Sequence, residues 1–323
     1  MDLLLPEDIR DPAIEALAAR FEVVSEPTLH QHRARLLSRA RETRALMVRN
    51  ATLVDAELLA AAPRLRVVGR IGVGLDNLDL PALSERGVVV CWPPEENAVS
   101  VAEHVFALLL SLARKVPAGD QSVRAGEWDR PAHIGFELFG KTLSILGMGR
   151  IGMLVALRAR AFGMRVLGYD PYLTAQSPAI TESGAELVSL AEALSRADVV
   201  SLHLPLTPET RRLLNAGALS QMKPTAVLLN TSRGGVVDEA ALTAALREGR
   251  LAGAALDVRE TEPPGDSPLH ALPNVVLTPH IASWTAESLH RVISTVAADV
   301  SRVLDGEPAR QFVNFPMPRP AQE

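Results

Sequence analysis

Thr142-Leu143-Ser144-Ile145-Leu146-Gly147-Met148-Gly149-Arg150-Ile151-Gly152 is the stretch of sequence that decides the fold. Its first five residues predict a buried strand, and the GxGxxG pattern of residues 147–152 follows directly, at the start of a helix-compatible stretch that runs to Phe162. Glycines at these positions permit a tight turn and a close approach of the backbone to a ligand, and the helix N-terminus offers unpaired N–H groups. The stretch therefore predicts a loop that binds the pyrophosphate of a dinucleotide.

An acidic residue after the following strand predicts which dinucleotide binds. Residues 165–169 form the next apolar run, and Asp170 follows it, 18 residues after Gly152. A carboxylate in this place accepts hydrogen bonds from both hydroxyls of an adenosine ribose and repels the 2′-phosphate of NADP. We therefore expect NAD as the cofactor.

Short apolar runs alternate with stretches of helical periodicity along most of the chain. Runs that are apolar throughout suit strands covered on both faces, and the stretches between them suit crossover helices. The expected fold class is α/β, with doubly wound parallel sheets. The predicted strands are residues 2–5, 45–48, 67–70, 88–90, 142–146, 165–169, 199–203, 226–230, 253–256 and 275–277.

The length of 323 residues suggests about two domains. Boundaries are expected near Val99, where a helical stretch begins, and near Thr285. If the last helix, residues 286–304, returns to the first domain, then that domain is discontinuous. Residues 1–98 and 286–323 would form a flavodoxin-like substrate-binding domain, and residues 99–285 a Rossmann NAD-binding domain inserted in it. The proline-rich residues 316–320 are expected to form a loose tail.

Composition excludes several classes of protein. Lys and Arg number 33 against 38 for Asp and Glu, so no excess of positive charge favours nucleic acid. The longest apolar stretch, residues 105–113, is too short to span a membrane, and the N-terminus lacks the basic segment of a signal peptide. The single cysteine, Cys91, fits a reducing compartment, so we expect a cytoplasmic protein. His30 and His32 have no Cys or carboxylate at ligand spacing, and no metal is expected.

Three polar side chains follow later strands of the predicted sheet. Arg233 lies between small residues, where a guanidinium either holds a carboxylate through two parallel hydrogen bonds or is a surface side chain of a turn. Glu262 lies in the loop after the next strand. His280 follows the last strand, a place suited to moving a proton near neutral pH but equally typical of a structural histidine. A carboxylate beside the ring would fix its orientation and favour its protonated form.

Taken together, the motifs of the chain resemble those of the D-isomer-specific 2-hydroxyacid dehydrogenases, and in particular the catalytic part of the phosphoglycerate dehydrogenases. The resemblance covers nearly the whole chain. It is carried by residues 72–77 (GVGLDN), 97–103 (NAVSVAE), 147–152 (GMGRIG), 203–207 (HLPLT), 222–224 (MKP), 230–238 (NTSRGGVVD), 255–258 (ALDV), 262–263 (EP) and 278–280 (TPH).

The resemblance implies a catalytic set of Arg233, Glu262 and His280. Arg233 would bind the substrate carboxylate and polarise the carbonyl, and Glu262 would partner His280. Hydride would pass between C2 of a 2-hydroxy acid and the nicotinamide ring, while His280 takes the hydroxyl proton or, in the reductive direction, donates it.

The resemblance also extends the cofactor site. It implies that Asp257 holds the nicotinamide carboxamide, that Ser100 approaches the phosphates, and that His203 and Pro205 line the adenine side. Polar residues at strand ends and helix starts are often only caps, and Arg150 either contacts a phosphate or is solvated. The expected cofactor-binding residues are Ser100, Gly147, Gly149, Arg150, Ile151, Gly152, Asp170, His203, Pro205, Thr231, Ser232, Asp257 and Ala282.

Four residues of the N-terminal part are expected to bind substrate. The resemblance implies that Val73 and Gly74 offer backbone N–H groups to the carboxylate. Arg49 and Arg70 each end an apolar run, and similar positions in phosphoglycerate dehydrogenases carry arginines that receive the distal phosphate. We therefore expect a substrate with a second anionic group, such as 3-phosphoglycerate or sulfolactate. The alternative is that both arginines are structural.

Other assignments stay open at this stage. Glu95 and Glu96 stand where the family has small or neutral residues, and they would repel a dianion if they faced the cleft. A glyoxylate or hydroxypyruvate reductase needs no distal anion site and is the alternative enzyme. An NADH-sensing scaffold, like the transcriptional corepressors of this fold, is the alternative class. Residues 126–133 resemble the family's dimer arm, so a homodimer is expected. The sequence ends before the serine-sensing domain of longer members, so serine feedback is not expected.

Overall fold

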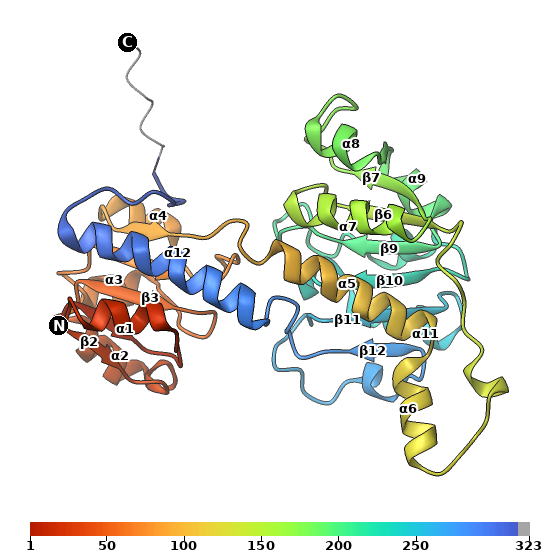
Figure 1. The fold of residues 1–323 in the computed structure, drawn as a ribbon, viewed down its shortest axis with the longest axis horizontal. Coiled ribbons are helices and arrows are strands. Elements are labelled where there is room, and N and C mark those ends of the chain that lie inside the picture. Colours follow the sequence, from red (N-terminus) through yellow and green to blue (C-terminus); the bar gives the residue numbers. More distant parts are fainter. Residues whose placement is uncertain (316–323) are drawn as a thin grey trace. The chain divides into compact units, whose positions relative to one another are not determined.

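The computed structural model describes residues 1–315, and the expected proline-rich tail at 316–320 lies outside them. The chain divides into two compact units, with boundaries between Asn97 and Ala98 and between Trp284 and Thr285. Residues 1–97 and the segment after Trp284 form unit 1, and residues 98–284 form unit 2. Each unit is a parallel sheet with helices on both faces (Figure 1).

Unit 1 contains five parallel strands in the order β2-β1-β3-β4-β5, the flavodoxin-like arrangement. The strands are β1 (Leu3–Leu5), β2 (Val23–Ser25), β3 (Ala45–Val48), β4 (Val67–Arg70) and β5 (Val89–Cys91). One face is covered by α1 (Pro12–Ala18) and α12 (Ala286–Asp305), and the other by α2 (Arg33–Ala40), α3 (Ala56–Ala61) and α4 (Leu80–Glu85).

The last helix packs against the first sheet of the chain. A Cβ on Gly69 of β4 would lie 2.7 Å from Val296 and 2.8 Å from Val300, both on α12. Only glycine lets the helix approach the strand so closely. Thr285 caps the helix N-terminus through a hydrogen bond from the Ser288 N–H.

Unit 2 contains seven parallel strands in the order β12-β11-β10-β9-β6-β7-β8, which includes the Rossmann order. The strands are β6 (Thr142–Leu146), β7 (Arg165–Tyr169), β8 (Glu186–Leu187), β9 (Val199–Leu202), β10 (Val227–Asn230), β11 (Gly253–Leu256) and β12 (Val275–Leu277). The helices are α5 (Ala98–Ala113), α6 (Val116–Arg124), α7 (Arg150–Ala161), α8 (Pro178–Ser183), α9 (Leu190–Arg196), α10 (Ala216–Leu219) and α11 (Glu239–Arg247).

The predicted fold class of two doubly wound parallel sheets is confirmed. Two strands, β2 and β8, were not predicted, because they are edge strands of three and two residues with exposed positions. The strand predicted at 88–90 runs from Val89 to Cys91, since the Val88 N–H bonds to Leu83 at the end of α4. No helix within residues 1–315 has the length and apolar content that crossing a membrane requires.

Parallel pairing decides where the loops of unit 2 gather. α5 and α7 lie side by side on one face of the sheet (Figure 1). α9, α10 and α11 pack on the other face. Because all seven strands run in one direction, their carboxyl ends lie at one edge of the sheet. Ligands of such sheets bind at this edge.

Candidate functional site

The glycine loop connects β6 to α7, and each of its glycines has a separate structural reason. Gly147 has φ +95°, and a Cβ there would lie 2.4 Å from the carbonyl oxygen of His203, which directly follows the neighbouring strand β9. A Cβ on Gly152 would lie 2.2 Å from the carbonyl oxygen of Gly147. Gly149 is the N-cap of α7 and has open space beside it. The N-terminus of α7 is thus left open to an anion, as a pyrophosphate requires.

Asp170 lies directly beside this loop. Its carboxylate accepts the N–H of Met148 (3.1 Å) and the N–H of Tyr172 (3.0 Å). These two bonds fix the carboxylate at the carboxyl end of β7, next to the glycine turn. The Asp170 carboxylate is therefore placed to accept hydrogen bonds from the hydroxyls of a ribose whose pyrophosphate binds the glycine loop.

The remaining cofactor residues occupy the neighbouring strand ends and the start of α5. The hydroxyl of Thr231 is buried and has no hydrogen-bond partner in the part of the chain that the structure describes, as expected of a group that faces a ligand. His203 follows β9, with Nε2 2.9 Å from the Ser201 hydroxyl, and burial lowers its pKa to about 4. Ser100 is buried in the first turn of α5, whereas Arg150 and Pro205 are exposed.

Arg233 follows β10 in a turn that Asn230 organises. The buried amide of Asn230 donates to the Arg233 carbonyl (2.9 Å) and accepts from both the N–H (3.0 Å) and the hydroxyl (2.8 Å) of Ser232. The Arg233 guanidinium donates to the Ser232 carbonyl (2.8 Å) and is partly exposed. Asn230 was not among the predicted site residues, although a buried amide ending an apolar strand was a signal for it.

His280 lies in a turn that Asp257 organises. The Asp257 carboxylate is fully buried and accepts the Thr278 hydroxyl (2.5 Å) and the N–H groups of Ile281 (2.9 Å) and Ala282 (2.8 Å). Burial alone would raise the pKa of Asp257, but these bonds and the nearby His104 lower it. The turn holds His280 at φ +55°, with its N–H bonded to the Asp257 carbonyl (2.8 Å).

Glu262 meets His280 in the loop after β11. Nδ1 of His280 lies 2.6 Å from Oε2 of Glu262, and Oε1 accepts the N–H of Arg259 (2.9 Å). Burial opposes ionisation of Glu262, but the hydrogen bonds from His280 and Arg259 hold the pKa of Glu262 below its usual value. The His280 side chain is 41% exposed, and its Nδ1 is held by Glu262. This arrangement suits transfer of a proton at Nε2.

The expected substrate residues belong to unit 1 and lie at the carboxyl ends of β3 and β4 or just after them. Arg70 is buried, and its guanidinium donates to the carbonyls of Gly74 (2.6 Å) and Ile71 (2.6 Å). Burial lowers the pKa of Arg49, opposed by the charges of Glu7 and Asp8.

The turn after β4 is supported by Trp92 as well as by Arg70, a contact that was not predicted from the sequence. Nε1 of Trp92 donates to the Val73 carbonyl (2.7 Å). Neither the Val73 N–H nor the Gly74 N–H donates to a backbone carbonyl within residues 1–315. Two adjacent N–H groups in such a turn suit an anion.

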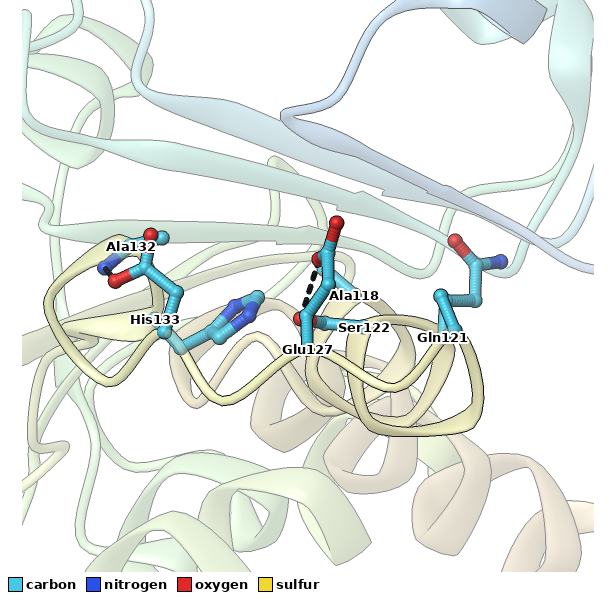
Figure 2. Close-up of a pocket in the computed structure, with 8 residues that line it drawn as sticks. Ala118, Gln121, Ser122, Glu127, Ala132 and His133 are labelled. Atoms are coloured by element: carbon cyan, nitrogen blue, oxygen red, sulfur yellow. Dashed lines mark hydrogen bonds between the residues drawn. The ribbon is translucent and has the colours of Figure 1, made fainter.

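The surface of unit 2 also has a hollow that is separate from the loops described above. It is formed by α6 and the segment after it, and none of its lining residues belongs to the loops that follow the strands (Figure 2). The Ser122 hydroxyl donates to Glu127 across it (2.8 Å).

Among the described residues, no three His, Cys, Asp or Glu side chains are grouped so as to hold a metal ion.

Comparison of the chain with known proteins identifies one family. Residues 106–282 match the family model described as D-isomer specific 2-hydroxyacid dehydrogenase, NAD binding domain. The D-3-phosphoglycerate dehydrogenase of Mycobacterium tuberculosis is 47% identical over 315 residues, which are 97% of this chain and 58% of that protein. The chain thus spans less than two thirds of the length of this relative.

Solved structures agree over the full length. The TT0316 protein of Thermus thermophilus superposes with a TM-score of 0.90 at 40% identity, covering 97% of this chain and 100% of that one. A glyoxylate reductase from Paecilomyes thermophila superposes with a TM-score of 0.87 at 31% identity, covering 97% and 98%. The chain therefore belongs to the D-isomer specific 2-hydroxyacid dehydrogenases and carries their NAD-binding domain.

Proposed function

We propose that this chain is an NAD-dependent dehydrogenase that interconverts a D-2-hydroxy acid and its 2-keto acid. The observation that carries the proposal is the His280–Glu262 pair, with Nδ1 and Oε2 2.6 Å apart, at the same sheet edge as the glycine loop and Arg233. A partly exposed imidazole held by a carboxylate is suited to acid–base work beside a nucleotide. A glycine loop and a ribose-binding carboxylate alone would fit any dinucleotide-binding protein.

Each residue has a defined task in this reaction. Arg233 binds the substrate carboxylate and stabilises negative charge that develops on the C2 oxygen. His280 takes the hydroxyl proton at Nε2 during oxidation and returns it during reduction. Glu262 accepts the Nδ1–H of His280 and so fixes the orientation of the ring. The nicotinamide cofactor, when bound, accepts or supplies the hydride.

Cofactor residues are proposed on the same basis. The N-terminus of α7 and the Thr231 hydroxyl face the phosphates and ribose, and Asp170 binds the adenosine ribose and disfavours NADP. Asp257 already accepts three hydrogen bonds from the His280 turn, so it supports the turn as well as any nicotinamide contact. Ser100, Arg150, Ile151, His203, Pro205, Ser232 and Ala282 complete the proposed set.

Unit 1 is the proposed substrate-binding domain. The N–H groups of Val73 and Gly74 would take the substrate carboxylate, and Arg49 and Arg70 would favour a second anionic group, as in 3-phosphoglycerate. Supporting this, the Mycobacterium tuberculosis relative bears the name D-3-phosphoglycerate dehydrogenase.

A glyoxylate or hydroxypyruvate reductase is the second candidate. It is favoured by the two guanidinium hydrogen bonds of Arg70 to the Gly74 and Ile71 carbonyls, because those donors already support the turn. The glyoxylate reductase among the structural neighbours is in keeping with it.

We also propose a cytoplasmic homodimer. Segment 116–139 of unit 2 exposes Trp128 (74%), Ile134 (74%) and Phe139 (79%), a concentration of apolar side chains typical of a covered surface. Cys91 is free and buried, and burial raises the pKa of its thiol, as suits a protein without disulfides.

A substrate panel tests the proposal. The purified chain would be assayed for oxidation of NADH and NADPH with phosphohydroxypyruvate, sulfopyruvate, hydroxypyruvate, glyoxylate and 2-ketoglutarate. We expect turnover with NADH and the highest kcat/KM for phosphohydroxypyruvate. Preference for glyoxylate or hydroxypyruvate would favour the second candidate. Tight NADH binding without turnover of any keto acid would refute the enzymatic assignment.

A further inference from the structure

The loop between β11 and β12 carries Glu262 but has little regular structure of its own, with only the short 3-10 helix η4 (Pro268–Ala271) within it. Arg259 lies near the start of this loop, and its side chain is only 7% exposed. Building on the function proposed above, we propose that Arg259, held by Glu239, is the positioning residue that fixes Glu262 against His280.

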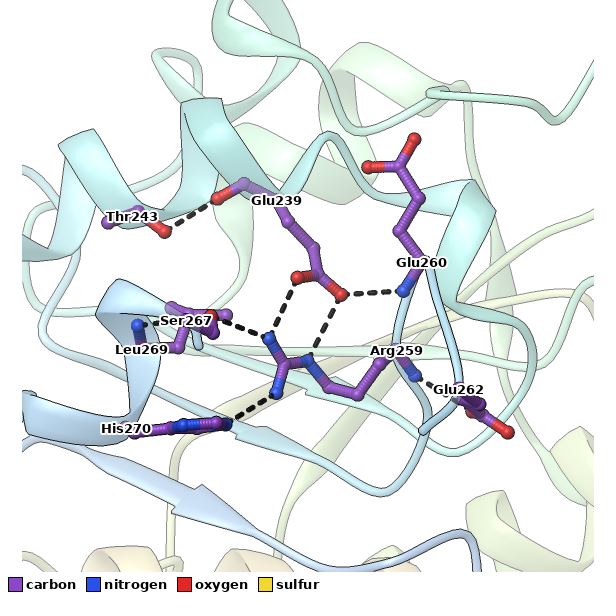
Figure 3. A network of polar contacts seen from close by, with 8 residues as sticks. All are labelled: Glu239, Thr243, Arg259, Glu260, Glu262, Ser267, Leu269 and His270. Carbon is purple, nitrogen blue, oxygen red and sulfur yellow. Dashed lines mark hydrogen bonds and ion pairs between the residues drawn. The ribbon is translucent and has the colours of Figure 1, made fainter. Parts of the chain in front are cut away.

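The Arg259 guanidinium is fully engaged with the rest of unit 2. Nε and Nη2 form a two-point contact with the Glu239 carboxylate, at 3.1 and 2.9 Å. Nη2 also donates to the Ser267 hydroxyl (2.8 Å), and Nη1 lies 3.3 Å from Nε2 of His270. Figure 3 shows these contacts converging on one side chain. The two ends of the loop are therefore joined through Arg259.

Glu239 provides a rigid anchor for this network. It is the first residue of α11, which begins directly after the turn that carries Arg233. Oε1 of Glu239 also accepts the N–H of Glu260 (2.6 Å), so the carboxylate holds two consecutive residues of the loop. A planar guanidinium fork matches a carboxylate in a way that lysine cannot.

Close packing fixes the backbone of Arg259 as well. A Cβ on Gly234 would lie 1.9 Å from both the carbonyl carbon and the carbonyl oxygen of Arg259. The loop that carries Glu262 thus lies directly on the turn that follows Arg233. Loss of the Arg259 side-chain contacts would leave this packing and the backbone hydrogen bonds of residues 259 and 260 as the constraints at that point.

The backbone of Arg259 contacts the acid–base pair directly. Its N–H donates to Oε1 of Glu262 (2.9 Å), while Oε2 contacts Nδ1 of His280 (2.6 Å). A carboxylate held at one oxygen presents the other in a fixed direction. Arg259 therefore acts through Glu262.

The surrounding charges explain why arginine is needed here. Glu239, Glu260 and Glu262 lie on or beside the loop, and of these Glu260 is paired with Arg212 (2.9 Å). Removal of the Arg259 charge would leave Glu239 part-buried near two other carboxylates. The loop would then relax away from α11.

A double-mutant cycle tests the proposal. Arg259→Met keeps the length of the side chain and removes its charge, and we expect kcat to fall about 10- to 100-fold with NADH affinity changed by less than about threefold. On the Glu262→Gln background, the same substitution should lower kcat by less than about twofold, because the carboxylate it positions is gone. Equal losses on both backgrounds, or no loss in the single variant, would overturn the proposal.

Two further variants guard against misfolding and nonspecific effects. Arg259→Lys and Glu239→Gln retain more of the packing, and each should give an intermediate loss of kcat that also shrinks on the Glu262→Gln background. Arg196→Met is the matched control, because it breaks another two-point Arg–Glu pair, with Glu186 at 2.8 and 2.8 Å, on α9. It should leave kcat unchanged.

A readout independent of turnover separates this proposal from the proposed function. In protein labelled with ¹⁵N-histidine, the Nδ1 resonance of His280, assigned with His280→Gln, should shift in the same direction in Arg259→Met and in Glu262→Gln, and not in Arg196→Met. If the wild type turns over no keto acid, the proposed function fails, yet the resonance still decides whether Arg259 positions Glu262. An unchanged resonance in Arg259→Met refutes the positioning role.

Discussion

Nδ1 of His280 lies 2.6 Å from Oε2 of Glu262, although the two residues belong to loops that follow different strands. His280 adopts φ +55°, a conformation that is uncommon for a residue with a side chain. Its N–H bonds to the Asp257 carbonyl, and the Asp257 carboxylate bonds to the two N–H groups that follow His280. The turn is thus over-determined, as expected where an unusual backbone conformation serves a site.

The first prediction concerns the charge of Glu262. Hydrogen bonds from His280 and Arg259 hold the pKa of Glu262 below its usual value, so its carboxylate is charged at neutral pH, beside Nδ1 of His280. Glu262→Gln keeps the shape and removes the charge, and we expect kcat for keto-acid reduction to fall about 100-fold. The loss should be similar for all keto acids that the wild type reduces, because Glu262 contacts Nδ1 of His280. Steady-state rates with two keto acids would check this, and a variant as active as the wild type would contradict it.

Arg233 is predicted to need its planar fork as well as its charge. Arg233→Lys should lower kcat/KM about 100-fold and Arg233→Ala further, since only arginine gives two parallel hydrogen bonds to a carboxylate. Added guanidinium should restore part of the activity of Arg233→Ala. The exposed Arg211 provides the control, and Arg211→Ala should behave as wild type. If Arg233→Lys were as active as the wild type, two parallel hydrogen bonds from residue 233 to the substrate carboxylate would not be needed.

Most strands of both sheets could be predicted from the sequence because buried parallel strands are largely apolar, and β1, β3 and β11 contain no polar side chain. Edge strands such as β8 have no such run. The glycine loop and Asp170 were also predictable, since a phosphate-binding turn depends on residues close together in the chain.

Contacts between distant residues could not be predicted in this way. Nothing in the sequence near Arg259 indicates that it pairs with Glu239, because Arg259 lies in the loop after β11 and Glu239 begins α11, and the two meet only through the order of β10 and β11. Trp92 likewise supports Val73 through one hydrogen bond from the next strand end. The meeting of Glu262 and His280 was expected only because the motifs resembled a known family.

Asp170 is predicted to set the cofactor preference. Asp170→Asn keeps an acceptor for the Met148 N–H but removes the charge that repels a 2′-phosphate. The ratio of kcat/KM with NADH to kcat/KM with NADPH should fall at least about 10-fold, through weaker NADH use and improved NADPH use. Glu182→Gln, at an exposed position of α8, is the control. An unchanged ratio would exclude Asp170 as the selector.

Substitutions of Arg49 and Arg70 are predicted to affect different substrates, although both residues were expected to bind a distal anion. Arg49→Ala should raise KM for phosphohydroxypyruvate about 10-fold and leave glyoxylate reduction unchanged. Arg70→Ala should lower kcat/KM for both substrates, because it releases the Gly74 and Ile71 carbonyls beside the proposed carboxylate site. The exposed Arg64 serves as control through Arg64→Ala. If Arg49→Ala affects glyoxylate and phosphohydroxypyruvate equally, the distal anion site is refuted.

The last prediction concerns stability in mild acid. Burial lowers the pKa of His203 to about 4, against about 6.5 for an unfolded histidine. Between these values the unfolded chain binds more protons, so the free energy of unfolding falls as pH falls from about 6.5 to about 4, by at most about 3 kcal/mol.

The ionised carboxylates act in a different pH window. Asp198, Asp257 and Glu262 are among the carboxylates with lowered pKa values, so their contribution is almost complete above about pH 5.5 and is lost as pH falls further. The slope between about pH 5.5 and 6.5 therefore reports mainly on His203.

Urea unfolding followed by circular dichroism at several pH values would measure that slope. His203→Gln should flatten it, because glutamine carries no titrating group, whereas His32→Gln, at an exposed position, should leave it unchanged. Parallel curves for wild type and His203→Gln would mean that the acid sensitivity comes from another group. A flattened curve would show that the adenine side of the proposed site keeps a neutral imidazole at the expense of stability in mild acid.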